Sequence, residues 1–336
     1  MILITNAPQA VDSILSRARR RLEPGGVNEE WKSHLAHIRG AMRLLKLRGT
    51  AQFSNPRSEK IFRILKAAIQ MRLFVLNSAN ASDFNALEID AFRDEHEFVP
   101  SETANKATSF FLRVARHLDR VKRVLQRSEM SSEPGLLTEE LDRLDTEAMD
   151  LDVSMAGWST VEPGWDMMTV SGSLDGTVWS HCSSHAQYYF YSFWVFLYWL
   201  RYLIARIKLH DTLIALVDVK RQCLPTRGQS TSLQLEQLDG RKSKHTDIIR
   251  ETTDQLIGLT AYALGDISNQ GVIRAGIKDG GAKSGWHDIN ACAAMQLVLP
   301  FKVLQQSVYI TLGQQDALGL AISQIADGLR RTSAPN

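Results

Sequence analysis

Cysteine is scarce in this sequence of 336 residues, which contains only Cys182, Cys223 and Cys292. The three cysteines are far apart, and none of them forms a CxxC pair. A disulfide framework or a structural zinc site needs more ligands at closer spacing. We therefore expect no disulfide scaffold and no cysteine-based metal site, and the pattern is typical of a reducing compartment.

The sequence also lacks an excess of one charge and lacks a long hydrophobic run. Its 39 Lys and Arg residues nearly balance 37 Asp and Glu residues, for a net charge of +2. This balance argues against binding nucleic acid over the whole surface, because affinity for phosphates needs a clustered positive excess. The stretch most like a membrane span, residues 186–200, is shorter than the ~20 apolar residues that a span requires. The N-terminus lacks the features of a signal peptide, so we expect a protein that is neither secreted nor transmembrane.

Motifs that carry catalysis are missing as well. There is no GxSxG elbow, and no Cys/His pair has the context of a nucleophilic site. The glycine-rich stretch 276–284 resembles a phosphate-binding loop, but Ala282 separates the second glycine from the lysine, so we expect a surface loop. His181, Cys182 and His185 offer three metal ligands without a clear fourth. We therefore predict no catalytic residues, no cofactor and no metal, and we favour a binding or regulatory protein over an enzyme.

Helical periodicity is the dominant signal that is present. Apolar residues recur at steps of three and four, which places them on one face of an amphipathic helix. This spacing occurs in residues 31–45, 111–125, 137–151 and 318–329. We see no convincing strand alternation, and we predict an all-α fold, an irregular multi-helix bundle around a central aromatic-rich helix.

Glycine and proline divide the helical pattern. We expect long irregular segments at residues 157–182, 224–243 and 266–286, where these residues or polar side chains accumulate. The first of these marks a candidate seam near residues 156–183. We nevertheless expect one helical domain over residues 1–336, because the aromatic helix beyond the seam must be covered on several sides.

Charged residues cluster in three places. Asp142, Asp145, Asp150 and Asp152 fall on the polar face of a predicted helix, and we expect all four to be solvated. Basic residues gather in the first helix, at residues 17–21, and in the predicted loop at residues 241–244. Either basic group could contact phosphate or act as a nuclear import signal, and solvated charge is the alternative.

The predicted aromatic helix, residues 185–208, carries the strongest candidate site. Core packing explains most of its rings, but Tyr and Trp have polar tips that need partners when buried. Together with the nearby arginines, these rings could line a pocket for a planar or amphipathic small molecule. The candidate pocket residues are Trp194, Tyr198, Arg201 and Tyr202.

Several segments together resemble the regulatory domain of fungal zinc-cluster transcription factors. The first, at residues 31–49, is similar to the family's W..HL..GA..LL..RG pattern. The stretch FLYWLRYLIARIKLHDTL, residues 196–213, resembles its W..YR..RI.LH..L helix. Residues 257–265 with the Leu299–Pro300 pair, and the terminal helix at residues 314–331, resemble its later helices. These segments occur in the same order as in the family, and together they span most of the chain from about residue 28.

This resemblance implies an all-helical regulatory domain, control of transcription and a nuclear location, often for genes of secondary metabolism. Family members normally begin with six closely spaced cysteines that bind two zinc ions and present a helix to DNA. This sequence has no such cluster, so we expect contact with DNA only indirectly or through a missing module. We expect protein partners and consider a small-molecule effector; the oligomeric state stays open.

The alternative is an enzyme or small-molecule-binding protein recruited from the same helical scaffold, in the cytoplasm rather than the nucleus. Its site would lie around the aromatic helix and the glycine-rich loop. The polar residues available there are Arg201, Tyr198, His185 and Asp211.

Overall fold

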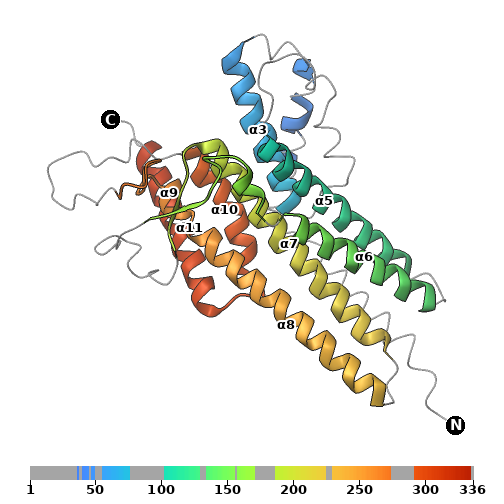
Figure 1. Cartoon of the computed structure of the whole chain (residues 1–336). Coiled ribbons are helices and arrows are strands. Elements are labelled where there is room, and N and C mark those ends of the chain that lie inside the picture. The colour runs from blue at the N-terminus through green and yellow to red at the C-terminus, as the bar shows by residue number, and fades with distance from the viewer. Residues whose placement is uncertain are drawn as a thin grey trace. The chain divides into compact units, whose positions relative to one another are not determined.

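A computed structural model describes residues 36–37, 40–44, 47–49, 55–75, 102–128, 134–155, 157–170, 186–224, 229–273 and 291–333. Within these residues, helices make up nearly all of the regular structure (Figure 1). The predicted all-α, multi-helix architecture is confirmed. Among the described residues there is one β-sheet, and it consists of two strands of two residues each.

The elements follow one another in a simple order. The long helices are α3 (Pro56–Val75), α5 (Glu102–Ser128), α6 (Pro134–Ser154), α7 (Phe193–Cys223), α8 (Gln229–Ile257), α10 (Ala291–Gln305) and α11 (Leu312–Ser333). The short elements are the 3-10 turn η3 (Trp158–Val161) and the helix α9 (Thr260–Ala263). Strand β1 (Met168–Thr169) pairs antiparallel with β2 (Tyr188–Tyr189).

The apolar spacing read from the sequence corresponds to buried helix faces. In α5, the residues at positions 111, 114, 118, 121 and 125 are all buried. The same holds for residues 141, 144, 148 and 151 of α6. Each helix therefore forms where one apolar face can be removed from water, which is the main source of helix stability in a folded protein.

The chain divides into two compact units that interleave along the sequence. Unit 1 comprises Met1–Val99, Leu112–Ser154 and Asp211–His245. Unit 2 comprises Pro100–Phe111, Met155–His210 and Thr246–Asn336. Helices α5, α7 and α8 each contribute residues to both units. The expectation of one domain over residues 1–336 stays a prediction.

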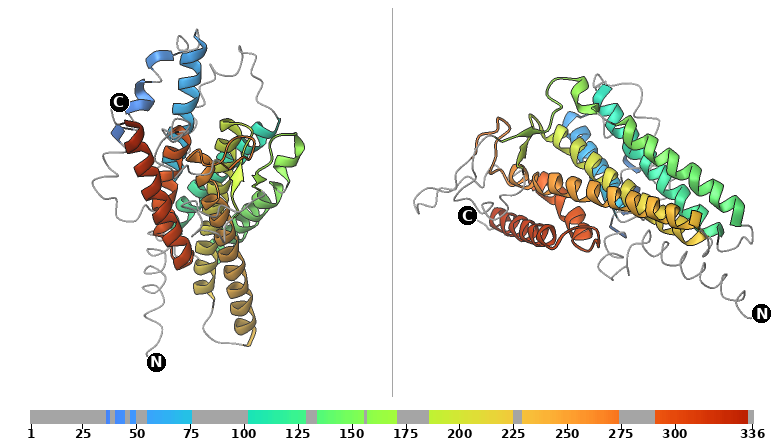
Figure 2. Two further views of the ribbon diagram at one scale, coloured as in Figure 1. Left: turned by 90° about the vertical axis from the view of Figure 1, so that its left-hand side faces the viewer. Right: turned by 60° about the horizontal axis from the view of Figure 1, so that its bottom comes forward.

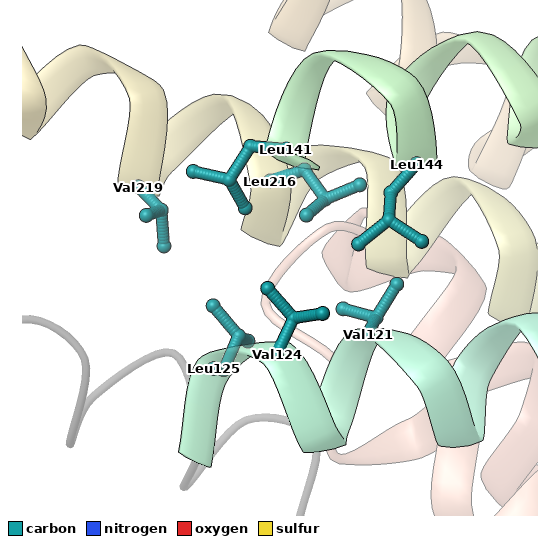
Figure 3. Packing of buried hydrophobic residues seen from close by; sticks show 7 residues of the cluster. All are labelled: Val121, Val124, Leu125, Leu141, Leu144, Leu216 and Val219. Carbon is teal, nitrogen blue, oxygen red and sulfur yellow. The ribbon is translucent and has the colours of Figure 1, made fainter. Parts of the chain in front are cut away.

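Unit 1 has a core built from three helices, as Figure 3 shows. Aliphatic side chains of α5, α6 and α7 point toward one another, and each is at most 5% exposed. Burying one such side chain stabilises the fold by about 1.5–3 kcal/mol. The cluster consists of Val121, Val124, Leu125, Leu141, Leu144, Leu216 and Val219.

Unit 2 contains the packed pair α10 and α11, which lie side by side in both Figures 1 and 2. A reciprocal capping box begins α11. The backbone N–H of Gln314 donates to Thr311 Oγ1 at 3.2 Å, and the N–H of Thr311 donates to Gln314 Oε1 at 3.0 Å. Gln314 Nε2 also donates to the carbonyl oxygen of Arg250 at 2.8 Å, which ties α11 to the last turns of α8.

The predicted start of the aromatic helix is wrong. Tyr188 and Tyr189 form strand β2, and the helix begins only at Phe193. The reason is a close approach of backbones, because the N–H of Tyr188 donates to the carbonyl oxygen of Gly258 at 3.1 Å. A Cβ at Gly258 would lie 2.2 Å from the carbonyl oxygen of Ala186, so only glycine fits this contact.

The predicted irregular segment at residues 224–243 is also wrong, because α8 already begins at Gln229. The segment is polar and contains Gly240, but one glycine inside a helix costs only about 1 kcal/mol relative to Ala. Ion pairs to α7 offset that cost. Lys242 Nζ lies 2.6 Å from Asp218 Oδ1, and Arg221 contacts Asp239 at 2.7 Å.

Candidate functional site

Four aromatic residues of unit 2 form a group centred on Trp158, which we name the tryptophan cluster: Trp158, Trp165, Trp199 and Tyr202. The ring centroid of Trp158 lies 6.4 Å from that of Trp165, 5.0 Å from Trp199 and 5.4 Å from Tyr202. The rings meet in tilted or edge-to-face geometry, which aromatic pairs prefer over face-to-face stacking. The four rings therefore pack against one another as one cluster.

Local backbone features place the loop tryptophans against α7. Gly157 precedes η3 with φ of 69°, a left-handed conformation that favours glycine. The turn that contains Gly157 brings the N–H of Trp158 to the carbonyl oxygen of Met155 at 3.3 Å. Trp199 Nε1 in α7 donates to the carbonyl oxygen of Trp165 at 2.7 Å, which fixes the loop to the helix.

Arg201 lies beside this cluster, with its guanidinium within cation–π distance of two rings. Its Cζ atom is 5.9 Å from the ring centroid of Phe111 and 5.9 Å from that of Tyr198, the geometry of cation–π contacts. Burial lowers the pKa of Arg201 and the neighbouring Tyr198 opposes that shift, but an arginine side chain keeps its charge in proteins. A positive charge is thus held among aromatic faces.

The structure brings together three of the four predicted pocket residues. Tyr198 contacts Trp165 with ring centroids 5.3 Å apart, Arg201 lies over Tyr198, and Tyr202 belongs to the tryptophan cluster. Trp194 lies one helical turn before Tyr198 in α7, and its ring contacts that of Phe193, with centroids 5.7 Å apart. That these residues line a ligand pocket stays a prediction.

Trp194 is linked through Phe193 to a second aromatic group in unit 2. Phe193 packs on Phe196 at 6.2 Å, and Phe196 lies 5.7 Å from Tyr262 of α9. Phe190 contacts Tyr262 at 5.2 Å and is fully buried. Burial raises the pKa of Tyr262 to about 12, so its hydroxyl stays protonated at neutral pH. We interpret this second aromatic group as part of the hydrophobic core of unit 2.

The site residues that sequence reasoning missed are Trp158 and Trp165. Both lie in a segment that we expected to be an irregular loop. The available signal was two tryptophans within eight residues, in the stretch GWSTVEPGW, since rings of this size gain much from burial. Trp158 contacts Tyr202 and Trp165 contacts Tyr198, so these contacts join positions more than 30 residues apart, which apolar spacing along a helix does not reveal.

Asp145 corrects the expectation that the acidic residues of α6 are solvated. Its side chain is only 7% exposed, and its Oδ2 atom accepts from Lys220 Nζ at 2.7 Å and from Arg241 at 2.5 Å. Burial alone would raise the pKa of Asp145, but the hydrogen bonds and charges of Lys220 and Arg241 hold that pKa below its usual value. Asp142 is exposed and also contacts Lys220, at 2.6 Å.

The basic group at residues 241–244 lies on a helix rather than in a loop. Arg241 contacts Asp145, and Lys242 contacts Asp218 at 2.6 Å. Lys244 is exposed. Two of these three cations therefore hold helices of unit 1 together, which leaves the segment little excess charge for phosphate.

His117 is a second buried titratable group of unit 1. Its side chain is 3% exposed, and Nδ1 lies 3.9 Å from Glu147 Oε2. Burial lowers the pKa of His117 to about 4, against the attraction of Glu147, so the ring is neutral at pH 7. Neither ring nitrogen has a hydrogen-bond partner among the described residues.

Several sequence candidates lie outside the described residues. These are the glycine-rich stretch 276–284, the arginines of residues 17–21 and the set His181, Cys182 and His185. Among the residues that the structure does describe, no group of three His, Cys, Asp or Glu side chains could hold a metal ion. In the same part of the chain, no helix has the length and apolar character needed to cross a membrane.

Comparisons with known proteins give no family assignment: the chain matches no protein-family model, no curated protein sequence and no solved structure.

Proposed function

We propose that this chain is a helical regulatory protein that controls the expression of a gene set through contacts with a protein partner or a small-molecule effector. The proposal is supported by the sequence segments that resemble the regulatory domain of fungal zinc-cluster transcription factors. With that resemblance come a nuclear location and a role in secondary metabolism, both of which are part of the proposal.

The observation that carries the effector site is the position of Arg201. Its guanidinium is flanked by the rings of Phe111 and Tyr198, and Tyr198 in turn contacts Trp165 of the tryptophan cluster. A guanidinium recognises carboxylate, sulfonate or phosphate groups through paired N–H donors. Aromatic faces beside it favour a planar apolar body. The effector class that fits is a planar aromatic molecule with one acidic group.

This site is tested with two fluorescent probes that differ in charge. Anilinonaphthalene sulfonate carries a planar apolar body and an anion, whereas N-phenylnaphthylamine has a similar body without the anion. We expect Arg201→Met to weaken binding of the sulfonate about tenfold, because a charge-assisted hydrogen bond is lost. Binding of the uncharged amine should stay within about twofold of wild type.

The matched control is Arg221→Met, which removes an exposed arginine from the same helix without touching the aromatic residues. Near-UV circular dichroism establishes that each variant keeps its packing. The site assignment is wrong if Arg201→Met and Arg221→Met weaken sulfonate binding equally, or if Arg201→Met weakens both probes alike.

The regulatory role has its own readout. The chain, fused to a fluorescent protein, should enter the nucleus, and when tethered to a heterologous DNA-binding domain it should change the output of a reporter gene. A chain that stays in the cytosol and turns over a metabolite would refute the regulatory role.

A further inference from the structure

One face of α5 carries four arginines in unit 1, which we name the arginine ridge: Arg113, Arg116, Arg120 and Arg123. Their spacing of three, four and three residues places them on a single side of the helix. The first and last are ten residues apart, or about 15 Å along the axis. The opposite side of α5 is the apolar face buried in the core, so the ridge is directed away from that core.

The ridge is partly used within the chain. Arg120 donates to both carboxylate oxygens of Glu147 in α6, at 2.6 and 3.3 Å. Arg123 pairs with Asp119 of its own helix at 2.9 Å. Arg113 and Arg116 are exposed, and neither forms an ion pair with another of the described residues. Arg120 is thus paired with the acidic helix α6 and Arg123 with its own helix, whereas the other end of the ridge presents two guanidinium groups to solvent.

The surroundings of the ridge select the kind of anion that fits. Helix α6, which Arg120 contacts, exposes the carboxylates of Glu139 and Asp150. A nucleic-acid duplex presents phosphates on two strands, so it would bring some of them toward these carboxylates, and like charges repel. A single helix with acidic residues along one face can lie on the ridge alone. The contact between Arg120 and Glu147 already shows this mode of pairing inside the chain.

We propose that the exposed end of the arginine ridge, at Arg113 and Arg116, docks an acidic helical segment of a partner protein. Glutamates at steps of three and four in the partner would face the arginines, and paired N–H donors suit their carboxylates. This inference rests on the proposed function, because it names the kind of protein partner through which the regulatory chain acts.

The test uses the whole chain and a labelled, alanine-rich helical peptide of about 18 residues with glutamates at those steps. A second peptide carries glutamine at the same positions. Fluorescence anisotropy at low salt should show tighter binding of the glutamate peptide, with affinity falling as salt is raised. Arg113→Gln/Arg116→Gln should weaken binding about fivefold.

The matched control is Lys244→Glu, because it lowers the net charge by two, as the double variant does, at an exposed site on α8. Binding to this control should stay within about twofold of wild type. The inference is overturned if both variants weaken binding equally, if the glutamine peptide binds as well, or if duplex DNA binds more tightly than the glutamate peptide. If the ridge variants do not change peptide binding while sulfonate binding still depends on Arg201, only this docking site is refuted. If the chain neither enters the nucleus nor changes the reporter output, the regulatory role is refuted.

Discussion

At the scale of single residues, Asp145 is the clearest case of a polar side chain whose role depends on the fold. Its carboxylate joins α6 to Lys220 of α7 and Arg241 of α8, all within unit 1. A buried ion pair adds modest net stability, because desolvation offsets much of the attraction. Removing one partner is different, since the remaining charge then stays buried without compensation.

We predict that Asp145→Asn lowers the free energy of unfolding by about 3 kcal/mol, because Lys220, only 11% exposed, loses its buried counter-charge and keeps its contact with the exposed Asp142. The exposed Asp150 lies on the same helix, and Asp150→Asn should change stability by less than about 0.5 kcal/mol. Urea unfolding followed by circular dichroism measures both. Equal losses of stability at the two positions would show that the ion pairs of Asp145 do not stabilise the fold measurably.

At the scale of elements, the apolar pattern in the sequence is enough to predict some helices but not others. In α5 and α6 the residues that step by three and four are the buried ones, so local spacing and tertiary packing agree. In α8 the N-terminal half is mostly exposed, and its stabilising partners, Asp218 and Asp145, lie on other helices. No local pattern encodes such partners, so from the sequence alone the polar run with Gly240 predicts a loop.

Two glycines, one inside α8 and one directly after its last residue, give opposite predictions. Gly240 has no atom within 4 Å of where a Cβ would stand, so Gly240→Ala should stabilise the chain by about 0.5–1 kcal/mol. At Gly258 a Cβ would lie 2.2 Å from the backbone of Ala186, so Gly258→Ala should destabilise by about 1–3 kcal/mol through overpacking. Thermal and urea unfolding of the two variants compare the effects, and a stabilising alanine at Gly258 would contradict the close approach of β2 to the end of α8.

At the scale of the whole molecule, the sequence predicted the helical class and part of the candidate site, but not the way distant segments meet. Tyr198, Arg201 and Tyr202 were predicted because they lie in one helix crowded with aromatic rings, whose polar tips and neighbouring arginines suit a ligand pocket. Trp158 and Trp165 were missed because their contacts with α7 depend on a loop whose path no periodicity describes. Asp145 and His117 were missed because helix spacing does not say which polar residue a neighbouring helix will cover.

These two buried groups also set how the stability of the chain depends on pH. Burial lowers the pKa of His117 from 6.5 to about 4, with Glu147 and Asp145 opposing and Arg120 adding to the shift. Between these values the unfolded chain binds a proton that the folded chain does not, so stability falls as pH falls from 6.5 to about 4. The loss at the lower end is about 3 kcal/mol. Asp145, whose folded pKa is lowered from 3.8, adds a loss only below that range.

His117→Leu separates the two effects, because leucine fills the buried space and cannot bind a proton. We expect the wild-type free energy of unfolding in urea to drop steadily from pH 7 to pH 4, and the drop in His117→Leu to be smaller by about 3 kcal/mol. Below the usual pKa of an aspartate, both proteins should lose stability together as Asp145 is protonated. An identical pH profile for the two proteins between pH 7 and pH 4 would mean that His117 is protonated in the folded chain, and hence that it is not enclosed in unit 1 as described.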